Sequence, residues 1–378
     1  MKIIYAFPEP LPLDRARGLQ AVSTVAALGR AGIEVDFAFV PVAGVDPFTH
    51  YGLNRPPGVT LIPIARSLPW PLSRLHSNRL FFANLRRHFG DQLYRLPLLV
   101  RHLKLAALIA ERLPGASMLY EAHEVFGDTA AAGKREANRA LERRIMAGAQ
   151  AVVANSGATA RRLKELYPGP AVPEVIPNGV DRPGQLPDKP WADARRHVIY
   201  AGSFFPWKGA AELVHAAAGL PGYCITLVGG DEARISELSS SVSDEGAEVL
   251  FAGHLPHAQV MSRLSAACIA VLPNRDNTDS SFTSPIKLFE YMAAGCAIVA
   301  SDLPALREIL NGEEAIWVRP GDPDALAAGI RRLGEDALLA TRMGQRVREK
   351  SIRYTWDARA GRLMVILGAF GQRQVARP

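Results

Sequence analysis

The chain has 378 residues, of which 48% are hydrophobic and 21% are charged. This length suits two domains, and this composition excludes intrinsic disorder as the main state. No apolar run approaches the roughly 18 residues of a membrane span, and the apolar patch before Pro8 is too short for a secretory signal. Cys224, Cys268 and Cys296 are odd in number and lie in apolar contexts, which indicates core side chains in a reducing compartment. We therefore expect a cytoplasmic protein.

The net charge of +7 is unevenly distributed along the chain. Residues 1–185 hold 23 Lys and Arg against 15 Asp and Glu, a balance of +8, and the remainder holds 21 against 22, a balance of −1. Residues 74–112 are the most basic part, and bulky apolar residues are interleaved with the charges: Phe81, Phe82, Leu85, Phe89, Leu96 and Leu99. This pattern favours a surface for an anionic membrane or nucleic acid, and the alternative is a solvated helix face over a core stripe. Because no recognised nucleic-acid-binding module accompanies the charge, we expect a membrane and no nucleic acid.

Strands alternate with helices throughout, which predicts parallel sheets covered on both faces. In the first half, strands are predicted for KIIYAF (2–7), IEVDFAFV (33–40), SMLYEA (117–122) and AVVAN (151–155), and EVIPNGVD (174–181) closes the unit. Helices are predicted near 17–30, around 134–147 and after Ser156, which has the side chain of a good N-cap.

The segment DRPGQLPDKPW (181–191) is rich in Pro, Gly and charge, which is typical of a linker. A second series of strands follows it: HVIYAG (197–202), YCITLVGG (223–230), EVLFAG (248–253), CIAVLP (268–273) and AIVAS (297–301). Helices are predicted from about Pro206, from Pro285, and near 322–333, 336–351 and 355–370. We therefore place an N-terminal domain at 1–185 and a C-terminal domain at 186–354.

Ligands of open parallel sheets bind at the carboxyl ends of the strands, so the loops there are candidate sites. In AGSFFPWKG (201–209), Pro206 is a favoured first helical residue, and Lys208 then falls in the first helical turn. A cation there opposes the helix dipole, which makes sense if an anion such as a phosphate lies between them. An exposed lysine that tolerates a small penalty is the alternative.

In SFTSPIKLFEYMAAG (281–295), Ser284 suits the N-cap and Pro285 the first helical position, so free amide groups form a second anion site. Lys287 and Glu290 share a helix face. A carboxylate in the second turn can accept hydrogen bonds from both hydroxyls of a ribose. An ordinary Lys–Glu surface pair is the alternative.

In LYEAHEVFGD (119–128), His123 follows a strand, where it can bond a sugar hydroxyl or titrate near neutrality. A satisfied structural histidine is the alternative. The chain lacks the G-x-x-x-x-G-K-[ST], G-x-G-x-x-G and G-x-S-x-G motifs. The string Asp322-Pro323-Asp324 favours an N-cap and a first helical residue over a metal site.

These segments, in this order, resemble glycosyltransferase family 4 over essentially the whole chain. ARGLQ (16–20) resembles the family's acceptor-side loop, with Arg17 and Gly18, and IPNGVD (176–181) contributes Asn178. YEAHE carries the histidine that the family places beside the donor sugar, here His123. SPIKLFEYMAAGCAIVASDLP (284–304) is the most specific stretch, and it resembles the E-x7-E region. The resemblance and the loops give this donor-binding set: Gly202, Ser203, Lys208, Gly229, Thr283, Ser284, Pro285, Ile286, Lys287 and Glu290.

The resemblance implies an α/β chain of GT-B fold, with two Rossmann-like domains facing each other across a cleft. YTWDARA (354–360) resembles the start of the last helix, which in this fold crosses back, so the helix at about 355–378 is assigned to the N-terminal domain. The implied reaction is transfer of a sugar, with retention, from a UDP- or GDP-sugar to a glycan or lipid-linked acceptor. Lys208 would stabilise the departing diphosphate, Glu290 would anchor the ribose and His123 would position the sugar, with no cofactor and no metal required. Peripheral attachment to the inner face of the cell membrane is expected.

Two positions depart from the family pattern. Ser203 stands where the family often has an arginine, and Phe282 stands where the first glutamate of E-x7-E falls. Lys287 is expected to replace the lost positive charge. The alternatives to a transferase are a nucleotide-sugar epimerase or hydrolase on the same fold, and a catalytically silent binding protein.

Overall fold

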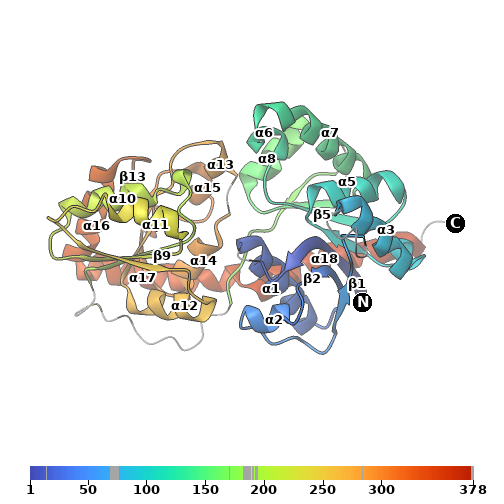
Figure 1. Ribbon diagram of the computed structural model, residues 1–378, viewed down its shortest axis with the longest axis horizontal. Coiled ribbons are helices and arrows are strands. Elements are labelled where there is room, and N and C mark those ends of the chain that lie inside the picture. Colours follow the sequence, from blue (N-terminus) through green and yellow to red (C-terminus); the bar gives the residue numbers. More distant parts are fainter. Residues whose placement is uncertain are drawn as a thin grey trace. The chain divides into compact units, whose positions relative to one another are not determined.

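The computed structural model describes residues 1–13, 15–68, 76–169, 171–181, 189, 191, 195–282 and 284–375. The chain divides into two compact units: unit 1 comprises Met1–Asn178 and Trp356–Pro378, and unit 2 comprises Gly179–Thr355. The predicted linker at 181–191 lies mostly outside the described residues. The colours of Figure 1 show that the last helix, α18 (Trp356–Val375), returns to the unit that contains the N-terminus.

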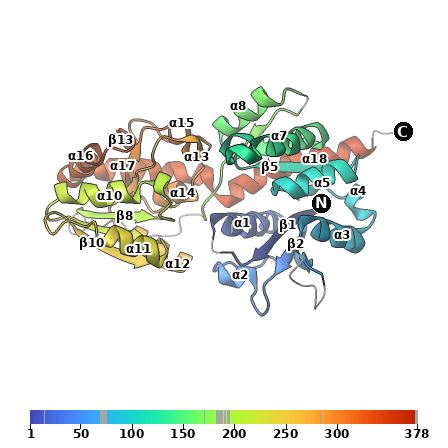
Figure 2. The ribbon, with the colours of Figure 1, turned by 45° about the horizontal axis from the view of Figure 1, so that its top comes forward.

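Unit 1 is built on one parallel sheet, in which the described residues form seven strands. The order is β3 (Val59–Pro63), β2 (Glu34–Pro41), β1 (Lys2–Leu11), β4 (Leu98–Val100), β5 (Met118–Ala122), β6 (Ala151–Ala154) and β7 (Glu174–Val175). The connecting helices are α1 (Ala16–Arg30), α2 (Pro47–His50), α3 (Asn78–Phe89), α4 (Gln92–Arg95), α5 (Leu103–Arg112), α6 (Phe126–Thr129), α7 (Ala132–Gly148) and α8 (Gly157–Leu166). Helix α18 packs beside α1, as both views show (Figures 1 and 2).

Unit 2 repeats this architecture with a second parallel sheet, of six strands in the described part of the chain. The order is β10 (Glu248–Gly253), β9 (Cys224–Val228), β8 (His197–Ala201), β11 (Ile269–Leu272), β12 (Ala297–Ser301) and β13 (Ala315–Val318). The helices and 3-10 turns are η1 (Pro206–Lys208), α10 (Ala210–Ala216), η2 (Ala217–Gly219), α11 (Glu232–Ser239), α12 (His257–Ala266), α13 (Thr278–Ser281), α14 (Ile286–Ala293), α15 (Pro304–Arg307), α16 (Pro323–Glu335), α17 (Ala337–Ser351) and η3 (Ile352–Tyr354).

The second sheet is buried on both faces because its strands are continuously apolar. Alternate residues of β8 and β11, such as Tyr200 and Val271, pack with α10 and α16 on one face. Their neighbours, such as Ile199 and Ala270, pack with α12 and α14 on the other face. This two-faced burial confirms the prediction of parallel sheets covered by helices.

The local signals for helix starts are confirmed at several places and wrong at two. Ser156 caps α8, where its Oγ accepts from the Thr159 amide at 3.2 Å, and Asp322 caps α16. The helix predicted from Pro206 begins instead at Ala210, because Gly209 interrupts it with a φ of +77°. Lys208 therefore lies in the 3-10 turn η1 and not in the first turn of an α-helix. The three short strands β3, β4 and β13 were not predicted.

The basic segment 74–112 is not one amphipathic surface helix. It contains α3, α4, β4 and α5, and most of the apolar residues that the sequence interleaves with the charges lie in the core: Phe81, Phe82, Leu85, Phe89 and Leu99. Arg79, Arg86 and Arg87 are exposed on α3, whereas Arg101 is half-buried, and Arg74 lies outside the described residues. The apolar part of the predicted membrane surface is therefore a core stripe. No helix in the described part of the chain is both long and apolar enough to cross a bilayer.

Candidate active site

The candidate residues of unit 2 gather at the carboxyl ends of β8 and β9 and at the start of α14. Gly202 and Ser203 follow β8, and Gly229 follows β9. The two loops touch backbone to backbone, since a Cβ on Gly229 would lie 2.2 Å from the Gly202 carbonyl oxygen. Gly229 also adopts a φ of +109°, which only glycine tolerates easily. The contact between the two loops therefore leaves no room for a side chain at Gly229.

Helix α14 is fixed to the end of β8 by Tyr291. The Ala201 amide donates to the Tyr291 hydroxyl at 2.7 Å, and this bond lies inside the core. One helical turn earlier, Lys287 extends under the loop after β8, where its Cδ lies 3.7 Å from the place of a Cβ on Gly202. The Lys287 side chain thus passes beside the loop after β8 inside the protein.

Lys287 is a buried cation without a hydrogen-bond acceptor. Its residue is 8% exposed, its Nζ has no hydrogen-bond partner among the described residues, and Nζ lies over the Tyr200 ring, 4.1 Å from the ring centroid. Burial lowers the pKa of Lys287 well below its usual range, and the charge of Lys208 lowers it further. Burial likewise lowers the pKa of Lys208 to about 8. The charge of Glu290 offsets the lowering of the Lys287 pKa only in part, and a bound anion would offset it further.

Glu290 does not pair with Lys287, so the alternative of an ordinary Lys–Glu surface pair does not hold. Glu290 is 7% exposed, and its Oε1 accepts from His257 Nε2 at 2.8 Å. Burial works to lower the pKa of His257, but the hydrogen bond to Glu290 and the charges of Glu290 and Asp181 raise it overall. The second carboxylate oxygen of Glu290 has no hydrogen-bond partner in the part of the chain that the structure describes, and it is available to a ligand.

The start of α14 differs from the prediction by one residue. Pro285 occupies the N-cap position with an extended backbone, and the first helical residue is Ile286. Ser284 is buried and lies before the cap, so it is not the N-cap that the sequence suggested. Thr283 lies outside the described residues. Phe282 is 9% exposed and packs as a core residue.

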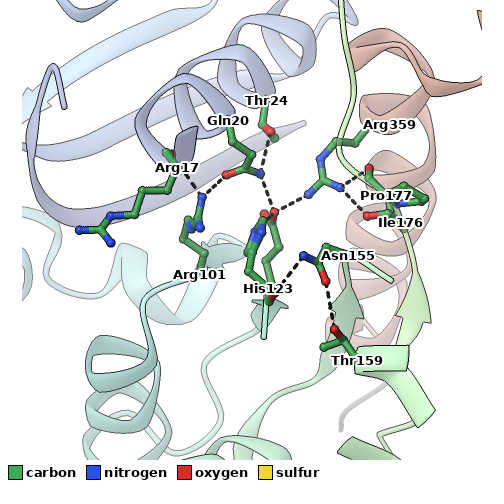
Figure 3. A network of polar contacts seen from close by, with 11 residues as sticks. Arg17, Gln20, Thr24, Arg101, His123, Asn155, Thr159, Ile176, Pro177 and Arg359 are labelled. Atoms are coloured by element: carbon green, nitrogen blue, oxygen red, sulfur yellow. Dashed lines mark hydrogen bonds and ion pairs between the residues drawn. The ribbon is translucent and has the colours of Figure 1, made fainter. Parts of the chain in front are cut away.

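The candidate residues of unit 1 centre on His123, directly after β5. Its side chain is mostly buried, and its Nε2 lies 2.5 Å from Glu121 Oε1 (Figure 3). Burial, followed by the charge of Arg101, lowers the pKa of His123 to about 4. His123 is therefore neutral at physiological pH, and the predicted titration near neutrality is wrong.

The predicted acceptor-side residues lie on the same carboxyl edge of this sheet. Arg17 is half-exposed and pairs with Glu9, with 2.5 Å between Nε and Oε2. Gly18 is buried because the Tyr51 hydroxyl fills the place of its side chain, 2.2 Å from where a Cβ would lie. Asn178 is buried at the end of the first segment of unit 1.

No group of three or more His, Cys, Asp or Glu that could hold a metal ion occurs among the residues that the structure describes. Asp322 of the D-x-D string accepts from the Ala325 amide at 2.9 Å, which confirms its prediction as an N-cap. The described cysteines are free thiols, and Cys268 and Cys296 are buried.

Four residues of these sites were not predicted from the sequence: His257, Gln20, Arg101 and Arg359. His257 starts the helix after β10, so its place after a strand end was a signal that could have been found. Arg101 likewise follows β4, a strand that was not predicted. Arg359 is separated from its partner Glu121 by 238 residues, and no local pattern links them.

The comparison with known proteins agrees with this organisation. Residues 19–182 match the family described as Glycosyltransferase Family 4, and residues 195–336 match Glycosyl transferases group 1. The phosphatidyl-myo-inositol mannosyltransferase of Mycolicibacterium smegmatis is 34% identical over 200 residues, which are 50% of this chain and 50% of that protein. The chain thus matches about half the length of this relative.

Solved structures share the fold over the full length. Sucrose-phosphate synthase from Thermosynechococcus elongatus has a TM-score of 0.78 at 21% identity and covers 100% of both chains. Anabaena Alr3699/HepE in complex with UDP-glucose has a TM-score of 0.74 at 18% identity, covering 98% of this chain and 100% of that one. The two Rossmann-like units therefore have the GT-B fold. Because the two family matches span most of both units in the expected order, the chain belongs to the family 4 and group 1 glycosyltransferases.

Proposed function

We propose that the chain transfers a glycosyl group, with retention, from a UDP- or GDP-sugar to a glycan or lipid-linked acceptor. In this reaction the bond between C1 of the sugar and the diphosphate breaks, the oxygen of an acceptor hydroxyl bonds to C1 on the same face, and the proton of that hydroxyl passes to the released diphosphate. The product would belong to a cell-surface polysaccharide or glycolipid. The name of the mannosyltransferase relative includes the lipid phosphatidyl-myo-inositol, and this supports a lipid-linked acceptor.

The observation that carries this proposal is the buried, unpaired ammonium of Lys287 beside Lys208. A buried charge is strongly unfavourable unless it is paired, and the glycine-rich loop after β8, beside Lys287, has the kind of backbone that can line an anion site. A diphosphate supplies the missing negative charge. As the sugar leaves, charge develops on the diphosphate oxygens, and two fixed cations stabilise it without further reorganisation.

The donor is expected to be a nucleoside diphosphate sugar because a carboxylate that can bind a ribose follows Lys287 on the same helix. Glu290 lies in the second turn of α14, three residues after Lys287, with one carboxylate oxygen held by His257. The other oxygen can accept hydrogen bonds from ribose hydroxyls. Anabaena Alr3699/HepE, which shares the fold, was solved with UDP and with UDP-glucose.

We expect a nucleoside diphosphate to stabilise the protein without added metal, because two lysines supply the charge that a divalent ion would otherwise supply. At 100 times its dissociation constant a ligand adds about 2.7 kcal/mol to the free energy of unfolding. The measurement is the melting temperature with UDP, GDP and their sugars, with magnesium and with a chelator. No shift with any nucleotide in either condition would contradict the donor site.

Lys208→Ala and Glu290→Ala should impair donor use in different ways. Each removes one charge-assisted contact, which typically contributes roughly 1.5–3 kcal/mol. Lys208→Ala should lower kcat more than it raises KM, because the leaving-group charge grows in the transition state. Glu290→Ala should mainly raise KM, because the contact with the ribose is equally strong in the ground state and in the transition state. Steady-state kinetics of both variants test this, and wild-type kcat and KM in both would overturn the assignment.

Product analysis with and without acceptor extract separates the transferase from an epimerase or hydrolase. Ser203 and Phe282 motivate the silent binding protein as the second candidate. A nucleotide that binds but is never turned over with any acceptor would favour that candidate.

Attachment to an anionic membrane is part of this proposal. Its support is the exposed positive charge of α3 and α4, because the apolar residues of this segment lie in the core. Arg79, Arg86 and Arg87 are exposed on α3, Arg95 is exposed on the adjacent α4, and one acidic residue, Asp91, lies between these helices. Each basic side chain near an anionic surface contributes on the order of 1 kcal/mol, so four give reversible attachment.

Reversal of Arg79, Arg86 and Arg87 to Glu should abolish co-sedimentation with vesicles that contain anionic lipid. Binding by the wild type should require the anionic lipid and weaken at high salt because of screening. The matched control reverses three exposed arginines of unit 2, Arg332, Arg342 and Arg353, and should retain binding. A wild type that stays in the supernatant at low salt would indicate a soluble acceptor.

A further inference from the structure

A single carboxylate oxygen in unit 1 accepts three hydrogen bonds. Glu121 lies in β5, two residues before His123, and is 1% exposed. Its Oε1 accepts from Gln20 Nε2 at 2.6 Å, from His123 Nε2 at 2.5 Å and from the Arg359 guanidinium (Figure 3). Three separate elements, α1, the loop after β5 and α18, therefore meet at this one atom.

Arg359, which binds Glu121, is held in place by two backbone carbonyls. Arg359 is 3% exposed, and its second guanidinium nitrogen donates to the carbonyls of Ile176 and Pro177 at 2.6 and 2.8 Å. Burial pushes the pKa of Glu121 upward, but Arg359, followed by His123 and Arg101, outweighs this and holds the pKa below its usual value. Glu121 is therefore an ionised carboxylate that can only accept hydrogen bonds.

This carboxylate determines which ring nitrogen of His123 carries the proton. Because Glu121 only accepts, Nε2 must donate and must be protonated. The ring is neutral, since burial and Arg101 hold its pKa at about 4, so it has one proton only. Nδ1 is then a bare acceptor, and it has no hydrogen-bond partner in the described ranges of the chain. The other groups facing the ring region are uncharged or cationic: Gln20, Asn155, Arg101 and Arg359.

We propose that Glu121, held by Arg359, is a positioning residue that fixes His123 as the neutral Nε2–H tautomer, so that Nδ1 accepts a hydrogen bond from a hydroxyl of the donor sugar. The assignment of that hydroxyl to the donor sugar rests on the proposed function. The assignment of the tautomer does not depend on the proposed function. His123 then selects substrates that offer a hydroxyl and is not a proton donor at neutral pH.

The test is nitrogen NMR of the full chain labelled at the histidine rings, without ligand, between pH 6 and 8. The chain has nine histidines, and His123→Asn identifies the signals of interest by their loss. The expected result is a protonated Nε2 and a bare Nδ1 that do not change over this range. A protonated Nδ1, or a ring that titrates near neutrality, would overturn the proposal even if nucleotides bind.

Glu121→Gln provides the second arm. Gln20, His123 and Arg359 all donate to the same atom, Oε1, so the amide oxygen should take that place, the amide nitrogen should take the place of Oε2, and the Nε2–H tautomer should persist. Gln20→Met is the matched control, because it removes one donor from Oε1 and leaves the carboxylate, and it should keep the wild-type tautomer. A protonated Nδ1 in folded Glu121→Gln would show that the oxygen at this place does not set the tautomer. If Glu121→Gln does not fold, the wild-type and Gln20→Met spectra still decide the proposal.

Turnover separates positioning from a merely structural role. Glu121→Met, which removes the acceptor, should lower kcat at least tenfold and leave the dissociation constant of the bare nucleotide unchanged, because unit 2 alone carries the candidate nucleotide residues. Glu121→Gln, which keeps an oxygen acceptor, should restore most of kcat. Equal losses of turnover and of nucleotide affinity would indicate general damage and count against the proposal. Failure of the proposed function would appear differently, as a wild type that binds no nucleotide at all.

Discussion

Lys287→Met is expected to stabilise the protein without ligand and to weaken nucleotide binding. In the wild type the buried Lys287 ammonium has no hydrogen-bond acceptor among the described residues, and it is compensated only by the Tyr200 ring and by the charge of Glu290. An unsatisfied buried polar group costs about 1–3 kcal/mol, and methionine fills a similar volume without that cost. The same substitution removes a charge-assisted contact with the diphosphate, so the dissociation constant of UDP or GDP should rise roughly 10- to 150-fold.

Lys287→Met is expected to raise stability and to lower nucleotide affinity, and this combination distinguishes a ligand-binding lysine from other lysines. A lysine that serves only the fold would lower stability when it is removed, and a surface lysine would change neither quantity. Lys350→Met is the matched control in the same unit: Lys350 pairs with Glu314 at 2.7 Å, so its loss should destabilise the protein and leave nucleotide affinity unchanged. Melting temperature and titration calorimetry measure both quantities. A destabilised Lys287→Met with normal affinity would remove Lys287 from the donor site.

Much of the fold follows from the distribution of apolar runs and the residues between them. Strands such as 197–202 and 297–301 are continuous apolar segments that end at Gly or Ser, and the structure places β8 and β12 there. The strands that were missed are short or mixed: β4 has three residues inside a strongly basic segment. The many basic residues around β4 belong to the flanking helices, and they obscure the short apolar strand between them.

Helix boundaries were harder, because two signals compete after β8. Pro206 favours a helix start, yet Gly209 three residues later adopts a left-handed conformation and ends the turn. The close approach of Pro273 requires a glycine at this position, since a Cβ on Gly209 would lie 1.8 Å from the Pro273 carbonyl oxygen. Pro273 belongs to the loop after β11, so the local sequence around Gly209 does not reveal this contact.

The chemistry of the sites depended on burial and on distant partners. The i, i+3 spacing correctly placed Lys287 and Glu290 near each other, but spacing does not reveal that both are buried. Glu290 instead pairs with His257, 33 residues earlier in the chain. His123 was found from its place after a strand, whereas its neutral state depends on Arg101 and on burial, which only the tertiary structure provides.

Arg359→Met is expected to be the most destabilising single substitution that we describe. Arg359 and Glu121 form an ion pair with side chains only 2% and 1% exposed, and Arg359 also binds two backbone carbonyls. Removal of one partner of a buried pair typically costs about 3–5 kcal/mol, because the other charge stays buried without compensation. Arg362→Met is the control on the same helix: Arg362 pairs with Glu174 at 3.1 Å with both side chains half-exposed, and such pairs contribute about 0–1 kcal/mol.

The loss in Arg359→Met should also depend on pH, and the sign follows from Glu121. In the wild type the pKa of Glu121 is depressed below 4.5, so the pair stabilises the fold above about that pH and loses its contribution as the pH falls through the folded pKa. Without Arg359, burial raises the pKa of Glu121, and the carboxyl group takes up a proton on folding. The variant should therefore lose less stability relative to the wild type at pH 5 than at pH 7. Melting temperatures of both variants and the wild type at the two values test this, and a loss for Arg359→Met that equals the Arg362→Met loss, or that grows on acidification, would contradict the buried pair.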